Sequence, residues 1–294
     1  DRSSPACFHV RAAMASGVTR KRLRGRDLRT PFRGVRVPVD RDVPARPEEA
    51  HRRRALEYAP RLAEGQAFCA ATALALWGLP MPGRPEREPV HVNAVLGGFP
   101  PRVPGASGHR FAAEVRHLDG LPLVGPVDAR LQCAAAGGAL DELVIIGDAM
   151  TRRVEPFATV DELARAVEGA ARRRGSKTLA SALPLIRPRT DSPGETRLRL
   201  LIVRAGFPEP EVNVPVLDAR GAFLGFGDLV FRDAGVAIEY EGGHHFDDIA
   251  QTRHDLDRLA AFERAGTRVL RTHSGTLTAP ALFFADLRRL LALR

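Results

Sequence analysis

The segment of residues 187–193 constrains this chain more than any other. It contains Pro188 and Pro193 and no aliphatic or aromatic side chain. Proline interrupts helices and strands, and a segment without apolar side chains adds nothing to a core. The segment therefore predicts a domain boundary, and 294 residues suffice for more than one compact domain. We expect residues 191–294 to fold apart from the chain before them.

The chain after this boundary has the pattern of a compact α/β domain. Apolar residues recur with helical spacing in some stretches and alternate in others. The predicted order is αβββαβα, with elements at 194–205, 211–217, 223–231, 236–241, 247–265, 268–272 and 280–293.

The chain before the boundary divides into two regions. Residues 1–58 contain a short basic helix capped by Thr19, followed by an alternating strand at 31–38, which is the layout of a winged helix-turn-helix. Residues 59–187 have the pattern of a small α+β region. Its helices are expected at 66–79, 128–136, 140–153 and after the capping box at 159–162, and its strands at 90–95 and 113–118.

Positive charge is concentrated at the start of the chain. Residues 1–60 contain 15 Lys and Arg against 7 Asp and Glu, whereas residues 191–294 contain 13 against 15. A basic region attracts polyanions such as DNA. A winged helix would place near phosphates the side chains of Arg20, Lys21, Arg22, Arg24, Arg33 and Arg36. A solvated basic surface without a nucleic-acid role explains the same pattern, so both interpretations stay open.

The composition argues against several other classes of protein. The longest uncharged stretch, residues 65–83, contains Pro80 and Pro82 and is shorter than the roughly 20 apolar residues of a bilayer-spanning helix. The three cysteines lie far apart without a C-x-x-C pair, which disfavours a disulfide framework or a cysteine zinc site. The first 17 residues lack the apolar core of a secretory signal. We therefore expect a cytoplasmic protein without a membrane partner.

The side chains that carry chemistry gather in the C-terminal domain. Asp228 lies near the end of one expected strand, and Glu239 and Glu241 lie two apart on the next, where alternation sends both to one face. Because like charges repel, a divalent cation is an economical explanation of the group. His244 and His245 follow, where they could transfer a proton. The alternative is that the glutamates form ordinary ion pairs with Arg232, Arg253 or Arg258.

Two further positions allow more than one interpretation. Glu195 stands three residues after Ser192, so it either closes a capping box or joins the acidic group. Gln251 and Asp255 share one side of the helix expected at 247–265, although its acidic residues are also typical of a solvated face.

Four motifs of the C-terminal domain occur in a recognisable order. They are SPGETR at 192–197, GDL at 227–229, IEYEGGHH at 238–245 and Gln251-x-Arg253-x-Asp255. In this order they resemble the Vsr-like (very-short-patch-repair-like) domains of the PD-(D/E)xK restriction-endonuclease superfamily. The resemblance covers residues 192–274 and implies a restriction-endonuclease-like fold that cleaves DNA with a metal ion.

The same resemblance implies roles for individual residues. Asp228 and Glu239 would hold Mg²⁺ or Mn²⁺, and Glu195 would support the metal through its helix. His245 would transfer the proton, and apart from the resemblance Glu241 is a second candidate for that transfer in a metal-dependent endonuclease. Supporting roles would belong to His244, Gln251, Arg253 and Asp255.

Three short stretches of the N-terminal half match a second family. They are GVTR at 17–20, FRGV at 32–35 and ATALALWGLP at 71–80. Through them residues 11–150 loosely resemble AbiEi-type antitoxins of type IV toxin–antitoxin systems. This resemblance implies a DNA-reading half and a toxin as a partner protein.

One departure from the first family bears on activity. The superfamily lysine, two residues past the second acidic position, is here Glu241, and residues 191–294 contain no lysine. Vsr-type enzymes also dispense with that lysine and depend on histidine. Two functions therefore remain, a metal-dependent DNA endonuclease, or a DNA-binding transcriptional regulator or antitoxin that keeps an inactive nuclease-like domain.

Overall fold

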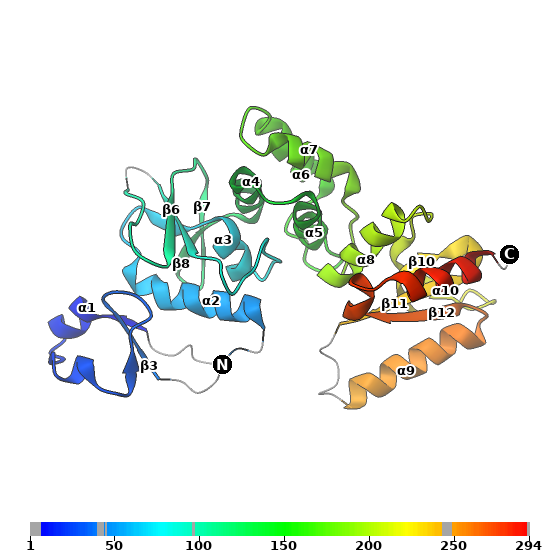
Figure 1. Cartoon of the computed structure of the whole chain (residues 1–294), viewed down its shortest axis with the longest axis horizontal. Helices are drawn as coiled ribbons and strands as arrows, with labels where there is room; N and C mark the ends of the chain where they lie inside the picture. Colours follow the sequence, from blue (N-terminus) through cyan, green and yellow to red (C-terminus); the bar gives the residue numbers. More distant parts are fainter. Residues whose placement is uncertain (1–6, 40–43, 45, 96–97, 243–248, 293–294) are drawn as a thin grey trace. The chain divides into compact units, whose positions relative to one another are not determined.

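The computed structural model describes residues 7–39, 44, 46–95, 98–242 and 249–292, with side chains from residue 256 onward in the last range. These residues form a mixed α/β fold with three β-sheets and ten α-helices (Figure 1). No helix among them combines the length and the apolar character that a bilayer crossing requires.

The chain divides into two compact units. Unit 1 comprises Asp1–Ile146 and Asp161–Pro184, and unit 2 comprises Gly147–Val160 and Leu185–Arg294. The longer stretch of unit 2 begins at Leu185, close to the expected boundary at 187–193. Unit 2 also includes residues 147–160, which the sequence pattern assigns to the region upstream.

Unit 1 begins with a small sheet of strand order β1-β3-β2. Its strands are β1 (Phe8–His9), β2 (Leu28–Arg29) and β3 (Val35–Pro38), and α1 (Val10–Ala15) follows β1 directly. The helix expected after Thr19 is instead one 3-10 turn, Arg22–Arg24, whose first backbone N–H donates to Thr19 Oγ1 at 3.2 Å. Gly25 follows this turn in an extended conformation, which ends the helical backbone.

A five-stranded sheet of order β6-β5-β4-β8-β7 follows in unit 1. Its strands are β4 (Gln66–Phe68), β5 (Val90–Ala94), β6 (Ala106–His109), β7 (Val115–Leu118) and β8 (Leu121–Val124), and it contacts α2 (Pro47–Tyr58) and α3 (Ala70–Leu76). The expectation of one helix over 66–79 is wrong at its start, because residues 66–68 pair with β5 as a strand. Short buried strands and buried helices have similar apolar runs, so periodicity could not separate them.

Four helices follow, namely α4 (Pro126–Ala136), α5 (Leu140–Met150), α6 (Val160–Gly169) and α7 (Ser176–Ala182). The α5 helix is three residues shorter than the expected helix at 140–153. The capping box at 159–162 stands at the start of α6, as expected.

Unit 2 has the expected element order αβββαβα. Its sheet has the order β12-β11-β10-β9, with β11 and β12 parallel and the other neighbours antiparallel. The strands are β9 (Glu211–Leu217), β10 (Phe223–Phe231), β11 (Val236–Glu241) and β12 (Arg268–His273), and the helices are α8 (Pro193–Arg204), α9 (Ile249–Arg264) and α10 (Ala281–Ala292).

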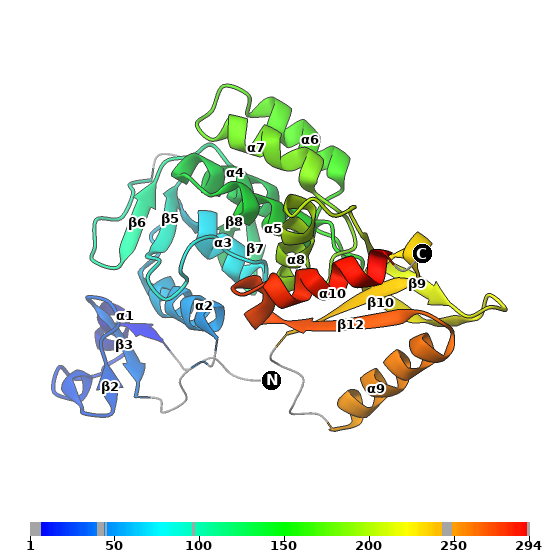
Figure 2. The same cartoon turned by 45° about the vertical axis from the view of Figure 1, so that its right-hand side comes forward.

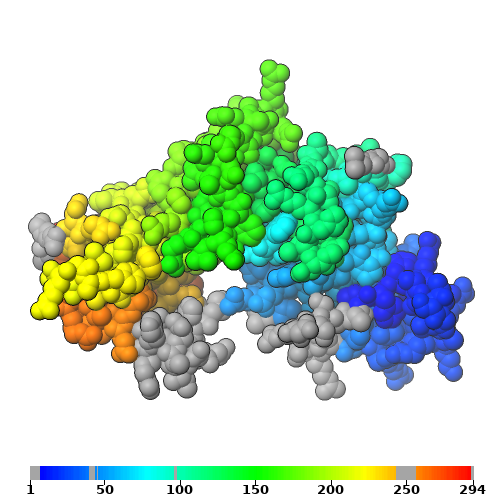
Figure 3. All heavy atoms as spheres, turned by 180° about the vertical axis from the view of Figure 1, so that it is seen from behind, coloured from blue at the N-terminus to red at the C-terminus, as the bar shows by residue number. Residues whose placement is uncertain are grey.

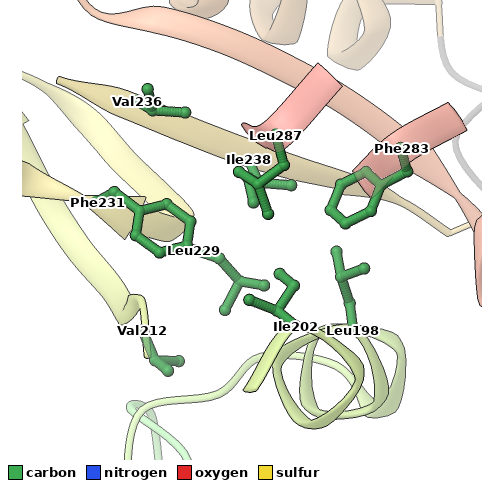
Figure 4. Close-up of a cluster of buried hydrophobic side chains, with 9 residues drawn as sticks. All are labelled: Leu198, Ile202, Val212, Leu229, Phe231, Val236, Ile238, Phe283 and Leu287. Atoms are coloured by element: carbon green, nitrogen blue, oxygen red, sulfur yellow. The ribbon is translucent and has the colours of Figure 1, made fainter. Parts of the chain in front are cut away.

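Helices cover both faces of this sheet (Figure 2). On one face, apolar side chains of α8 and α10 meet those of the strands in the cluster of Figure 4, which includes Leu198, Ile202, Leu229, Ile238, Phe283 and Leu287. On the other face, Phe262 of α9 packs with Val230 and Ala237. Because side chains alternate along a strand, residues two away from these last two strand positions also belong to the α9 face.

A buried ion pair holds residues 147–160 to the rest of unit 2. Arg199 Nη2 donates to Asp148 Oδ2 at 2.9 Å, and the two side chains are 1% and 0% exposed. Thr196 Oγ1 donates to the same carboxylate oxygen at 2.9 Å, and Arg199 Nη1 donates to Glu209 Oε1 at 2.8 Å. These contacts explain why the end of α5 belongs to unit 2 although it precedes the expected boundary.

Candidate active site

Two carboxylates face each other across β10 and β11. The antiparallel register pairs Leu229 with Ile238, and its next step brings Asp228 opposite Glu239 on the α9 face. The backbone N–H of Asp228 donates to Glu239 Oε1 at 3.3 Å, and the N–H of Tyr240 donates to Asp228 Oδ2 at 2.8 Å. Each carboxylate is thus fixed by the backbone of the opposite strand.

The environment of this pair disfavours a second negative charge. Glu239 is only 4% exposed, and Asp228 is half-buried. Burial, and then the charges of Glu239 and Glu195, hold the pKa of Asp228 well above its usual range, while the Tyr240 N–H and the Arg258 guanidinium lower it only in part. Asp228 is therefore a carboxyl group that a nearby positive charge would stabilise in its ionised form.

Arg258 of α9 is a cation that contacts Glu239 of the pair. Its Nη2 donates to Glu239 Oε2 at 2.9 Å, and its Nη1 donates to the carbonyl oxygen of Phe226 at 2.7 Å. Gly225 leaves room for the arginine stem, since a Cβ at this position, with φ of 153°, would lie 2.8 Å from Arg258 Cδ. The ion pair with Arg258 that the sequence allows as an alternative for Glu239 is present in the structure.

Glu195 caps its own helix and also lies near the acidic pair. Its N–H donates to Ser192 Oγ at 3.2 Å, as in a capping box, while its Oε2 accepts from the Asp191 N–H at 3.1 Å and from Asn213 Nδ2 at 2.8 Å. Burial raises the pKa of Glu195. Its charge in turn raises the pKa of Asp228, so the two sequence interpretations of Glu195 are compatible.

Sequence reasoning missed Asn213. This residue of β9 is 2% exposed, and its backbone adopts a left-handed φ of 45°. Its side-chain amide donates a hydrogen bond to the Glu195 carboxylate. The signal for it is a lone amide between the apolar residues Val212 and Val214 of the strand, since a buried polar side chain needs a partner.

Glu241 has a different partner from Glu239. It forms an ion pair with Arg271 of β12, and both side chains are roughly half exposed. Arg232, the other described arginine considered as a partner for these glutamates, pairs with Glu211 instead. Glu241 is thus balanced by a surface arginine, separately from the Asp228–Glu239 pair.

The remaining candidates of the C-terminal domain cannot be placed. His244 and His245 lie outside the described residues, as do the side chains of Gln251, Arg253 and Asp255. Within the described part of the chain, no three His, Cys, Asp or Glu side chains form a group able to hold a metal ion. The described part of the candidate site is therefore the Asp228–Glu239 pair, and Glu195, which was expected to support a metal there, does not complete a three-carboxylate group with it.

The basic side chains of the N-terminal region fall into two groups. Arg22 forms an ion pair with Asp27 at 2.7 Å, and Arg36 is half-buried with its Nε donating to the Leu23 carbonyl at 2.8 Å. The others are exposed, in the blue segment at the surface in Figure 3, and are Arg20, Lys21, Arg24 and Arg33. This second group is available to an anionic partner.

Comparison with known proteins adds no relative. No protein-family model, curated protein or solved structure matches this chain. Interpretation of the site therefore depends on its own geometry.

Proposed function

We propose that unit 2 is a metal-dependent DNA endonuclease module of restriction-endonuclease-like fold. The observation that carries this proposal is the Asp228–Glu239 pair, two carboxylates locked opposite each other with the pKa of Asp228 held well above its usual range. Carboxylates that lie together on one face of a sheet, away from water, and whose negative charge is not fully balanced by neighbouring cations are typical of sites that bind a divalent cation.

Two of the described residues have the donor chemistry that such an ion prefers. Asp228 and Glu239 would hold Mg²⁺ or Mn²⁺, because both ions prefer carboxylate oxygens. When bound, the ion would acidify a water molecule and neutralise charge on the phosphodiester. Arg258 orients Glu239 through its ion pair and is anchored by the Phe226 carbonyl. Asn213 holds Glu195 beside the pair.

The basic start of unit 1, as a winged-helix-like region, would bind the DNA. The exposed side chains of Arg20, Lys21, Arg24 and Arg33 support this assignment, because neutralising phosphates with such residues releases counterions. Mutations in unit 1 would then reduce DNA binding, and mutations in unit 2 would reduce DNA cleavage.

The test is cleavage of supercoiled plasmid by the full chain with Mg²⁺ or Mn²⁺. We expect nicked and linear products that a chelator abolishes. Asp228→Asn and Glu239→Gln should remove cleavage and spare DNA binding. Asp286→Asn is the matched control, since this carboxylate lies on the surface of α10, where it pairs with Arg289. Cleavage that survives Asp228→Asn would refute the assignment of the site.

A second candidate function is a DNA-binding regulator or antitoxin with an inactive nuclease-like unit. The specific observation in its favour is that Glu239 and Glu241 have arginine partners in Arg258 and Arg271. Under this alternative the same protein binds DNA but leaves supercoiled, linear and mismatched substrates uncut in either metal. A toxin would then be the partner to seek.

A further inference from the structure

Unit 1 contains an exposed aromatic side chain with an arginine above its ring. Phe99 is 77% exposed, and the guanidinium carbon of Arg110 lies 5.8 Å from its ring centroid. Both belong to an open hollow of about 380 Å³, here called the Phe99 hollow, which is also lined by Ala94, Gly98, Phe111 and Ala112. This volume falls in the range of small-molecule sites.

The backbone around Phe99 is held in place. Gln66 Nε2 donates to the Phe99 carbonyl at 2.7 Å, and the Gly98 N–H donates to the Val95 carbonyl at 2.9 Å. Gly98 packs so closely on Gly65 that a Cβ would lie 2.4 Å from the Gly65 carbonyl oxygen. The ring is thus presented to solvent by a fixed backbone, which lowers the entropy cost of binding to it.

A second cavity that shares Phe111 with the hollow has hydrogen-bond donors in its lining. A smaller cavity of about 30 Å³ shares Phe111 and Ala112 with the Phe99 hollow, and its lining includes Asp128, Gln132, Arg173 and Arg174. Gln132 is 4% exposed, and its Oε1 accepts from the Ala70 N–H at 2.9 Å. Its Nε2 is buried and has no hydrogen-bond partner among the described residues, which is costly unless an acceptor binds there.

We propose that the Phe99 hollow binds an unpaired nucleotide of single-stranded DNA. Every base has a flat π face that stacks on an exposed aromatic ring, and Arg110 adds a cation to the same stack. Arg173 and Arg174 beside the adjoining cavity supply charge for the phosphodiester, and Gln132 Nε2 supplies a donor for an oxygen acceptor. This inference rests on the proposed function in taking DNA as the ligand.

The test is fluorescence anisotropy of the full chain with a labelled oligothymidylate of about 15 nucleotides and with a duplex of equal length. Phe99→Ala should weaken binding of the single strand about 5- to 150-fold, the usual effect of removing one stacking platform. Binding of the duplex should change little, because it depends on the basic N-terminal side chains. Phe99→Trp should keep the affinity, and the oligonucleotide should quench its indole emission.

Control variants separate base stacking on Phe99 from the loss of any exposed apolar or charged side chain. Two control variants should leave the affinity for the single strand unchanged. Leu282→Ala removes an apolar side chain of α10 that is 82% exposed, and Arg102→Ala removes an exposed cation that is near the hollow in sequence. The inference is overturned if Phe99→Ala binds the single strand as the wild type does, or if the emission of Phe99→Trp is not quenched. It is also overturned if Phe99→Ala abolishes only self-association in sedimentation velocity, which would make the hollow a contact between copies of this chain.

The same proteins distinguish this inference from the proposed nuclease. Loss of single-strand binding in Phe99→Ala, with no plasmid cleavage by the wild type, would support the nucleotide site and reject the endonuclease. If Asp228→Asn removes cleavage and Phe99→Ala binds the single strand as the wild type does, the endonuclease would be supported and the nucleotide site rejected.

Discussion

Asp228 and Glu239 exchange hydrogen bonds with each other's strand. Glu239 Oε1 accepts the N–H of Asp228 itself, and Asp228 Oδ2 accepts the N–H of Tyr240, the residue after Glu239. At this point the two carboxylates accept backbone N–H groups of the opposite strand. Neither side chain can therefore rotate away from the other without losing a hydrogen bond. Their mutual repulsion is therefore built into the sheet and has consequences for stability.

The first prediction concerns stability as a function of pH without metal. Because the pKa of Asp228 is raised in the folded protein, that carboxyl keeps a proton which the unfolded chain releases near pH 4. Its contribution to the free energy of unfolding therefore falls as the pH rises from about 4 to the raised value. Asp228→Asn keeps an acceptor for the Tyr240 N–H and carries no charge. In urea titrations, its stability relative to wild type should increase with pH across this window.

The second prediction concerns metal binding as a source of stability. An ion that binds only the folded state adds about 2.7 kcal/mol at a concentration 100 times its Kd. Mg²⁺ or Mn²⁺ should therefore raise the melting temperature of the wild type but not that of Asp228→Asn. Equal shifts in both proteins, measured by calorimetry, would exclude Asp228 as a ligand.

The third prediction concerns Arg258. Removing one partner of a buried ion pair typically costs about 3–5 kcal/mol, and because Arg258 is 21% exposed we expect the lower end for Arg258→Ala. Arg258→Lys should recover only part of the lost stability, since a single ammonium group lacks the two-armed guanidinium that reaches both Glu239 and the Phe226 carbonyl. Chemical denaturation measures both. If the cation site is real, Mg²⁺ should stabilise Arg258→Ala more than wild type.

Sequence periodicity predicted the fold of unit 2 well and that of unit 1 less well. The strands 211–217, 223–231 and 236–241 have the expected bounds, because each alternates between two buried faces and ends at turn residues. In unit 1 the helix expected at 66–79 included residues 66–68, which instead form β4 by pairing with β5, a tertiary contact that no local pattern encodes. The short β6 and β8 were missed for the same reason.

The acidic residues of the site were visible in the sequence, and Arg258 was among the partners that it allowed for them, but Arg271 was not. Alternation was enough to put Glu239 and Glu241 on one face, yet it could not show that Arg258 would reach the first and Arg271 the second. Those arginines come from a helix and a strand distant in the chain. Asn213 was missed because its role depends on the approach of α8 to β9.

The fourth prediction concerns the glycine before Glu195. A Cβ on Gly194 would lie 2.0 Å from Cε1 of Tyr240, so Gly194→Ala must displace the start of α8 or the tyrosine ring. Such overpacking costs typically about 1–3 kcal/mol. Gly194→Ala should therefore lower stability and, under the proposed function, cleavage as well. Pairing it with Tyr240→Ala should restore part of the stability, and a double-mutant cycle showing additive losses would contradict the contact.

The last prediction concerns the exposed basic side chains of the N-terminal region. Arg20, Lys21 and Arg24 are exposed, whereas neighbouring Arg22 is neutralised by Asp27 and Arg36 is bound to backbone carbonyls. Each phosphate that a protein neutralises adds about 0.9 to the slope of log K against log salt. Replacing all three by alanine should thus weaken binding to every duplex sequence and reduce that slope by about 2.7.

A matched triple variant separates this local effect from the change in net charge. Arg165, Arg220 and Arg264 are also exposed, lie outside the N-terminal region, and lose the same total charge when replaced by alanine. If the N-terminal side chains contact phosphates, this control should keep most of the affinity and the salt slope of the wild type, because counterion release depends on contact and not on net charge alone. Equal losses in the two triple variants would show that the basic start of the chain attracts DNA only through the overall field of the protein.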